Sequence, residues 1–233
     1  MGPTPVVGRC PRRGLNARPK LMTYKLTSSK LTTCKLDARS TTTSLNLKGL
    51  GEMSLLPVTR MGDPVLRAVA APIVDPTDQA IIALAQSMME TMVDAPGVGL
   101  AAPQVGQSLR MIVMRLIADR GAVDEPLRMM TLINPELEAI GDEIELGWEG
   151  CLSVPELRGV VPRHARIGYR GWLPDGTRVE GEAAGFQARI LQHEVDHLDG
   201  ILYLDRMRDF STLGYGPEIQ AAAEAAHKVD AAL

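Results

Sequence analysis

Two histidines lie four positions apart in the segment QHEVDH, residues 192–197. Residues 186–191 contain neither glycine nor proline, so we expect a helix to run into this segment. Residues four apart share one face of an α-helix, and His193 and His197 can therefore bind the same metal ion. Glu194 is placed to take a proton from a metal-bound water. A buried structural helix whose polar side chains are satisfied by neighbours would contain the same short pattern.

The third ligand of such a site is not determined by spacing alone. A catalytic metal generally has three protein ligands and an open position for water. The metzincin pattern would place a histidine at position 203, where this chain has Tyr203. Glu218 is positioned as in thermolysin-like enzymes, although an exposed acid in a first helical turn explains it equally. Cys151 offers a thiolate that suits zinc or iron beside two imidazoles, but it could also be a buried structural thiol.

The composition is that of a globular protein in a reducing compartment. Of the 233 residues, 45% are hydrophobic and 23% are charged, and no apolar run approaches the length needed to cross a bilayer. The three cysteines show no paired spacing, which argues against a disulfide framework.

Charge is divided unevenly along the chain. Residues 1–50 contain ten basic residues and one acidic residue, whereas residues 51–233 contain 15 basic and 27 acidic residues. This division predicts a disordered basic extension at 1–52 and a folded domain at 53–233. We favour an artefact of an upstream start codon, with Met53 as the true first residue. An organelle transit peptide and a nucleic-acid-binding arm are the alternatives.

The pattern of apolar residues and turn signals predicts an α+β fold with mainly antiparallel pairing. Asp75-Pro76 is a favourable helix start, and Pro174-Asp175-Gly176 is a favourable hairpin turn. The expected helices lie at 75–95, 185–198 and 217–232, and the expected strands lie at 109–117, 129–133, 166–173 and 177–182. A further strand pair is expected across 137–148.

Three sequence blocks together resemble those of the peptide deformylase family. They are GVGLAAPQ at 97–104, EGCLS at 149–153 and QHEVDH at 192–197, in the family's order and spacing. The resemblance extends over about residues 53–210, which makes 53–233 a deformylase catalytic domain. It implies mainly antiparallel sheets packed around a central metal-binding helix, with a C-terminal helix. Pro103 departs from the threonine of many members without affecting the chemistry.

The resemblance also implies a reaction and a cofactor. It places one divalent metal ion on Cys151, His193 and His197, with ferrous iron preferred and zinc, nickel or cobalt as substitutes. The reaction is hydrolysis of the N-formyl group from the initiator methionine of new polypeptides. Glu194 would move the proton, and the oxyanion would be bound by the catalytic groups that the family assigns to this step: the side-chain amide of Gln104 and the backbone N–H of Leu152.

Substrate contacts follow from helical spacing and from the resemblance together. Phe186 and Ile190 precede His193 on the metal-facing stripe and are expected to line a methionine pocket opposite Val98, although both could be ordinary core residues. The residues expected to complete the substrate site are Gly99 and Gly150, whose backbones would pair with the extended peptide, and Arg158 at the cleft mouth.

The expected partners and location follow from the same resemblance. We expect ribosome-associated nascent chains as partners, without membrane or direct nucleic-acid binding by the domain. The expected location is the bacterial cytoplasm, or a mitochondrion or plastid if residues 1–52 are a transit peptide. Asp196, off the face shared by the two histidines, is expected to pair with Arg163. A metalloprotease using Glu218 and a non-catalytic nucleic-acid-binding protein remain the competing functions.

Overall fold

The computed structural model describes residues 55–116 and 128–230, except the side chains of 226–230. Its larger sheet has five strands in the order β1-β2-β3-β6-β7, and every neighbouring pair is antiparallel. The strands are β1 (Gly99–Ala101), β2 (Met111–Leu116), β3 (Arg128–Ala139), β6 (Arg166–Trp172) and β7 (Arg178–Ala184). The expected boundary at Met53 lies outside the described residues.

A smaller antiparallel sheet contains the first three residues of the EGCLS block, Glu149–Cys151. Its three strands, in the order β4-β5-β8, are β4 (Ile144–Cys151), β5 (Val154–His164) and β8 (Gly214–Tyr215). The pairing of β4 with β5 shifts register between Gly150 and Cys151, where the chain turns back toward Val154. This irregularity places Cys151 at the end of a strand and next to a tight turn.

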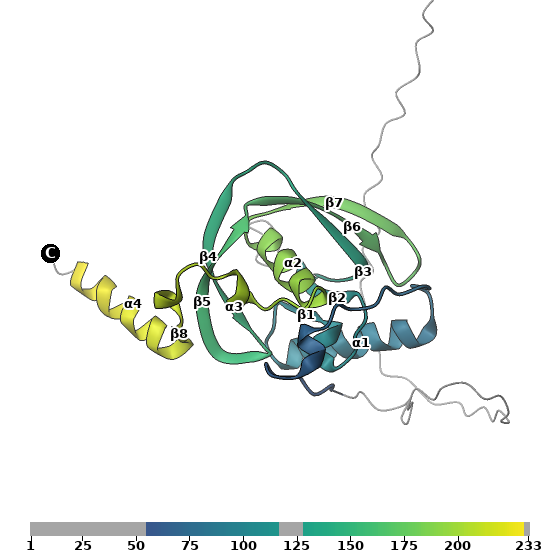
Figure 1. Ribbon diagram of the computed structural model, residues 1–233, viewed down its shortest axis with the longest axis horizontal. Coiled ribbons are helices and arrows are strands. Elements are labelled where there is room, and N and C mark those ends of the chain that lie inside the picture. Colours follow the sequence, from purple (N-terminus) through teal and green to yellow (C-terminus); the bar gives the residue numbers. More distant parts are fainter. Residues whose placement is uncertain (1–54, 117–127, 231–233) are drawn as a thin grey trace, which may run out of the picture.

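The helices are α1 (Gln79–Asp94), α2 (Gly185–Leu198), α3 (Tyr203–Arg206) and α4 (Gly216–Asp230). Short 3-10 turns are η1 (Pro64–Arg67), η2 (Ala102–Val105) and η3 (Phe210–Thr212). Helix α2 lies at the centre of the molecule, enclosed by strands of both sheets, whereas α4 extends away from the body (Figure 1). None of the helices in the described part of the chain is long and apolar enough to span a membrane.

The apolar face of α2 anchors it against the larger sheet. Leu191 and Leu198 are fully buried and belong to one cluster with Ile112 of β2 and Ile167 of β6. Replacing a buried leucine such as Leu191 with alanine typically costs about 2–5 kcal/mol of unfolding free energy. The opposite, polar face of the same helix is therefore held in a fixed orientation.

Several expectations from the sequence are confirmed. The fold is α+β with antiparallel sheets around a central helix, and a C-terminal helix is present at α4. Helix α2 has the expected bounds of 185–198, and β6 and β7 form the expected hairpin.

Two expectations about local structure are wrong. Helix α1 starts at Gln79 with Asp78 as its N-cap, because the side chain of Asp75 instead closes a turn onto Thr77. No strand pair forms across 137–148 in the structure. Strand β3 pairs with β2 and β6, whereas β4 pairs with β5 in the other sheet.

Candidate metal centre

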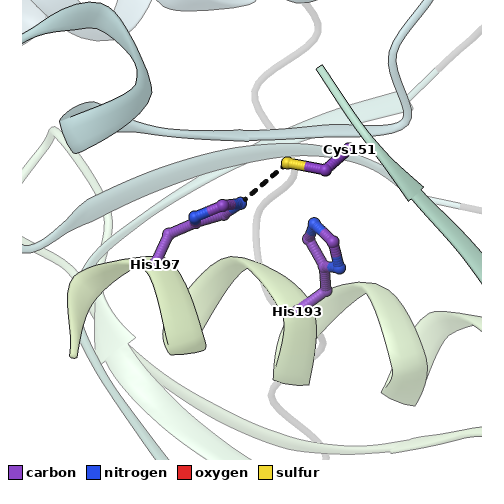
Figure 2. A group of neighbouring side chains, drawn as sticks. All are labelled: Cys151, His193 and His197. Carbon is purple, nitrogen blue, oxygen red and sulfur yellow. Dashed lines mark hydrogen bonds between the residues drawn. The ribbon is translucent and has the colours of Figure 1, made fainter. Parts of the chain in front are cut away.

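The predicted metal ligands converge at the end of β4. His193 and His197 project from successive turns of α2 toward Cys151 (Figure 2). The Cys151 Sγ atom is 3.2 Å from His197 Nε2, and one ligand atom from each of the three residues lies within 4.8 Å of the others. Among the described residues, no other group of three His, Cys, Asp or Glu side chains brings its ligand atoms this close together. Glu218 is exposed in the first turn of α4 and does not belong to it.

Glu149 fixes the orientation of the first histidine. Its Oε2 atom lies 2.8 Å from His193 Nδ1, so the ring donates from Nδ1 and keeps Nε2 for a metal. Tyr203 stacks on the same ring at a centroid distance of 6.1 Å. Burial disfavours the charged imidazolium, but hydrogen bonds to Cys151 and Glu149 outweigh it and hold the pKa of His193 well above its usual value. The pKa of His197 is well below its usual value because of burial and the nearby charge of His193.

Buried charged side chains continue the hydrogen-bond network beyond Glu149. Arg163 donates from Nε to Oε1 of Glu149 at 2.9 Å and from Nη2 to Oε2 at 3.0 Å. Burial opposes ionisation of Glu149, but hydrogen bonds and charge from His193 and Arg163 outweigh burial and lower its pKa to about 2. Arg163 also donates to Asp196 at 2.5 Å, which confirms the expected ion pair. Arg206 donates to both oxygens of Asp196, from Nη2 to Oδ1 at 2.7 Å and from Nε to Oδ2 at 3.1 Å.

Glu194 is buried beside the converging ligands. Burial raises the pKa of its carboxyl group to about 7, and within the described residues its Oε2 atom has no hydrogen-bond partner. A Cβ atom built on Gly99 would lie 2.3 Å from Glu194 Oε1, so a side chain at position 99 would displace the carboxylate. The strand residue thus has to be glycine for Glu194 to occupy this position.

Gln104 and Leu152 both lie next to Cys151, each in a separate turn of the chain. Gln104, which is 1% exposed, accepts a hydrogen bond from the Ala101 backbone through Oε1 at 2.8 Å. Its Nε2 atom is thereby directed toward Cys151 Sγ at 3.4 Å and Ser153 Oγ at 3.2 Å. Leu152 follows Cys151 in the turn and borders the adjoining pocket.

A pocket of about 500 Å³ opens over these residues. Ile190 is buried in its wall, whereas Val98 and Phe186 remain about half exposed at its rim. All six residues predicted to contact substrate border this one pocket: Val98, Gly99, Gly150, Arg158, Phe186 and Ile190.

Four further residues lie at this site and have no role predicted from the sequence: Glu149, Ser153, Trp148 and Arg189. For two of these residues, the location in the sequence could have indicated a role at the site. Glu149 belongs to the EGCLS block, and Arg189 lies one helical turn before His193. The partners of both residues come from distant segments, which a single sequence does not reveal.

A family model described as polypeptide deformylase matches residues 55–212. The chain belongs to the peptide deformylase family. It is 48% identical to peptide deformylase 1 of Bordetella pertussis over 159 residues, which are 68% of this chain and 90% of the relative. It is 43% identical to peptide deformylase 1 of Prochlorococcus marinus over 172 residues, covering 73% of this chain and 90% of that protein.

Solved deformylases share the fold described above. A structure of the Acinetobacter baumannii class I type b enzyme with Met-Ala-Ser bound is 39% identical, with a TM-score of 0.61, and covers 67% of this chain and 100% of that one. The Thermotoga maritima deformylase is also 39% identical, with a TM-score of 0.60, and covers 67% of this chain and 99% of that one. Deformylation of nascent peptides is the general function of this family, and the family is metal-dependent.

The residues of this deformylase fit a divalent metal. One thiolate and two imidazoles form a mixed sulfur and nitrogen donor set suited to iron or zinc, and three ligands leave a position for water. The unpartnered Oε2 atom of Glu194 faces no competing donor within the described residues, so it is free to bind such a water. The buried carboxylate of Glu149 gives His193 the outer partner that metal-binding imidazoles generally have.

Proposed function

We propose that this chain is a metal-dependent hydrolase that removes the N-formyl group from the initiator methionine of newly made polypeptides. The observation that carries the proposal is the convergence of Cys151, His193 and His197 beside a buried Glu194, at one pocket. The metal ligands would be those three residues. When bound, a divalent ion lowers the pKa of water and polarises the formyl carbonyl group. Ferrous iron is the proposed ion, with zinc, nickel or cobalt as substitutes.

Glu194 is the proposed general base and acid. A carboxyl group with a pKa of about 7 can both accept and release a proton near neutral pH. Glu194 would take a proton from the attacking water and then give it to the amine that leaves. Because Gly99 has no side chain, the carboxylate can lie against the backbone of β1 beside the proposed metal ligands.

Gln104 and Leu152 are the proposed donors to the oxyanion of the tetrahedral intermediate. The hydrogen bond from Ala101 N–H to Gln104 Oε1 keeps the amide from flipping, so its Nε2 remains directed toward the site. The backbone N–H of Leu152 would supply the second donor. Removal of one such donor typically costs about 3–4 kcal/mol of transition-state stabilisation.

The pocket is proposed to hold the methionine side chain between Ile190, Phe186 and Val98. Gly99 and Gly150 would pair their backbones with the extended peptide, and Arg158 would lie at the mouth of the cleft. The physiological substrates would be nascent chains at the ribosome. The proposed place of action is a bacterial cytoplasm, with a mitochondrion or plastid as the alternative if residues 1–52 act as a transit peptide.

A chelator experiment tests this function. The protein is expected to release formate from formyl-Met-Ala-Ser, to lose this activity with a chelator and to regain it with ferrous iron added without oxygen. An otherwise identical acetylated peptide with an internal peptide bond should remain intact. Glu194→Gln is expected to retain metal but lose activity. Cleavage of the internal bond, without formate release, would instead support a metalloprotease. Nucleic-acid binding that survives loss of α2 would support the binding-protein alternative.

A further inference from the structure

A short stretch of chain before η1 contacts both turns that carry the proposed oxyanion donors. The Thr59 backbone N–H donates to the carbonyl oxygen of Gln104 at 2.7 Å, and the Met61 backbone N–H donates to the carbonyl oxygen of Ser153 at 2.7 Å. Gln104 lies in η2, and Ser153 follows Leu152 in the turn between β4 and β5. The stretch therefore binds the residue that supplies one donor and the immediate neighbour of the residue that supplies the other.

The two donors come from different parts of the fold. Gln104 follows β1 of the larger sheet, whereas Leu152 follows β4 of the smaller sheet. Both must lie about 3 Å from one oxyanion, so the separation of their turns has to be fixed. In the described part of the chain, no backbone hydrogen bond joins η2 directly to the β4–β5 turn. The direct hydrogen bonds run from Gln104 Nε2 to Ser153 and Cys151, and they use the same amide group that would serve the oxyanion.

The spacing of the two bridging N–H groups suits this task. Alternate N–H groups of an extended chain lie on the same edge, roughly 6–7 Å apart. Thr59 and Met61 are such an alternate pair, and the N–H of Arg60 between them has no hydrogen-bond acceptor among the described residues. The separation of the pair therefore sets the distance between the two carbonyl oxygens that it binds, and with it the distance between the two turns.

The stretch is anchored on both sides and is not a loose end of the domain. Upstream, the Leu56 N–H donates to Thr91 Oγ1 of α1 at 2.9 Å, and the Leu56 side chain packs on the buried cluster around α1. Downstream, the Asp63 carboxylate accepts from the Val65 N–H at 3.0 Å, and Leu66 of η1 is fully buried. Contacts outside the two turns thus restrain the bridging N–H groups.

We propose that Thr59 and Met61 are positioning residues for the reaction. Their backbone N–H groups hold η2 and the β4–β5 turn at the separation that lets Gln104 and Leu152 bind one oxyanion. This inference rests on the proposed function. The oxyanion develops as the reaction proceeds and is not present in the bound substrate. A change in the separation therefore lowers kcat and leaves KM nearly unchanged.

The test removes one bridging N–H with proline. Thr59→Pro deletes the bond to Gln104, and Arg60→Pro is the matched control, because it adds the same ring next door without deleting a hydrogen bond to a described residue. With formyl-Met-Ala-Ser, kcat per bound metal is expected to fall about tenfold in Thr59→Pro, less than the roughly 100-fold typical of losing a whole donor. KM should stay unchanged, and Arg60→Pro should keep both parameters. In metal-free protein, nuclear magnetic resonance relaxation should show a more mobile Gln104 side-chain amide in Thr59→Pro than in Arg60→Pro.

A double-mutant cycle separates positioning from a general loss of structure. Gln104→Ala keeps the backbone carbonyl that Thr59 binds but lacks the side-chain donor, so the addition of Thr59→Pro should lower kcat little further. General destabilisation would lower kcat by the same factor in both backgrounds. If Thr59→Pro does not fold, replacement of Thr59 by its α-hydroxy analogue gives the same comparison, because it exchanges the N–H for an ester oxygen without adding a ring.

The possible results distinguish this inference from the proposed function. Equal kcat values for the Thr59 variant and Arg60→Pro, with formate still released, would overturn the inference and leave the deformylase function intact. Equal losses in the two backgrounds of the cycle, or a rise in KM at constant kcat, would overturn it as well. Absence of formate release by the unmodified protein would contradict the function and the inference together.

Discussion

Removal of the Arg163 guanidinium group is expected to destabilise the protein more than any change at an exposed ion pair. Arg163 lies between Glu149 and Asp196, and the three side chains are 5%, 4% and 9% exposed. Arg163→Met would remove the buried cation that binds both carboxylates, leaving Glu149 with Arg189 and His193, and Asp196 with Arg206. Removal of one partner from a buried pair typically costs about 3–5 kcal/mol. Asp196→Ala should cost less, because Arg163 keeps its two bonds to Glu149.

The assay is equilibrium unfolding in urea of metal-free protein, so that differences in metal affinity do not contribute. Arg166→Met removes the same side chain from an exposed pair with Glu182 and serves as the control. We expect the largest loss of unfolding free energy for Arg163→Met, a smaller loss for Asp196→Ala and almost none for Arg166→Met. An Arg163→Met protein that unfolds at the same urea concentration as the control would refute the assignment of a buried charge network.

Three further predictions concern other parts of the site. Gly99→Ala is expected to lower kcat by about 100-fold with metal content unchanged, because the added Cβ displaces the Glu194 carboxylate; unaltered kcat would contradict that packing. The pKa of Glu149 is lowered in the folded protein, so this carboxylate contributes to the unfolding free energy. The contribution is fully present above the ordinary carboxyl pKa of 4.5 and is lost as the pH falls toward about 2. This linkage amounts to about 3 kcal/mol, and in Glu149→Gln the acid-induced loss of unfolding free energy should be correspondingly smaller. A chain that starts at Met53 should hydrolyse formyl-methionyl peptides as well as the full chain, and an inactive or insoluble product would place the extension within the fold.

The central helix could be predicted from the sequence because its signals are local. Residues 185–198 lack an internal helix breaker, and the spacing of His193 and His197 shows which face carries the ligands. The choice of Cys151 over Glu218 could not be made from spacing. It depended on the family resemblance, because the two candidates come from segments whose distance from α2 is set by tertiary structure.

The division into two sheets could not be predicted for a related reason. Strand β5 contains Pro155 and Pro162, which weaken any strand signal, yet both are accommodated in this sheet. Strands β3 and β4 follow each other closely, so neighbouring residues suggested a pair, but each has its partner elsewhere in the chain. The supporting roles of Glu149 and Arg189 depend on the same long-range contacts.

The most direct test of the account is the metal content of two variants, Cys151→Ala and Glu218→Ala, purified without oxygen and assayed for formate release from formyl-Met-Ala-Ser. Cys151 lies within 4.8 Å of both histidine ligand atoms, whereas Glu218 lies outside this group at the exposed start of α4. Cys151→Ala is expected to lose most of its metal and essentially all activity, and Glu218→Ala is expected to keep both. Retention of metal and activity by Cys151→Ala, together with their loss in Glu218→Ala, would contradict the deformylase assignment of the metal centre.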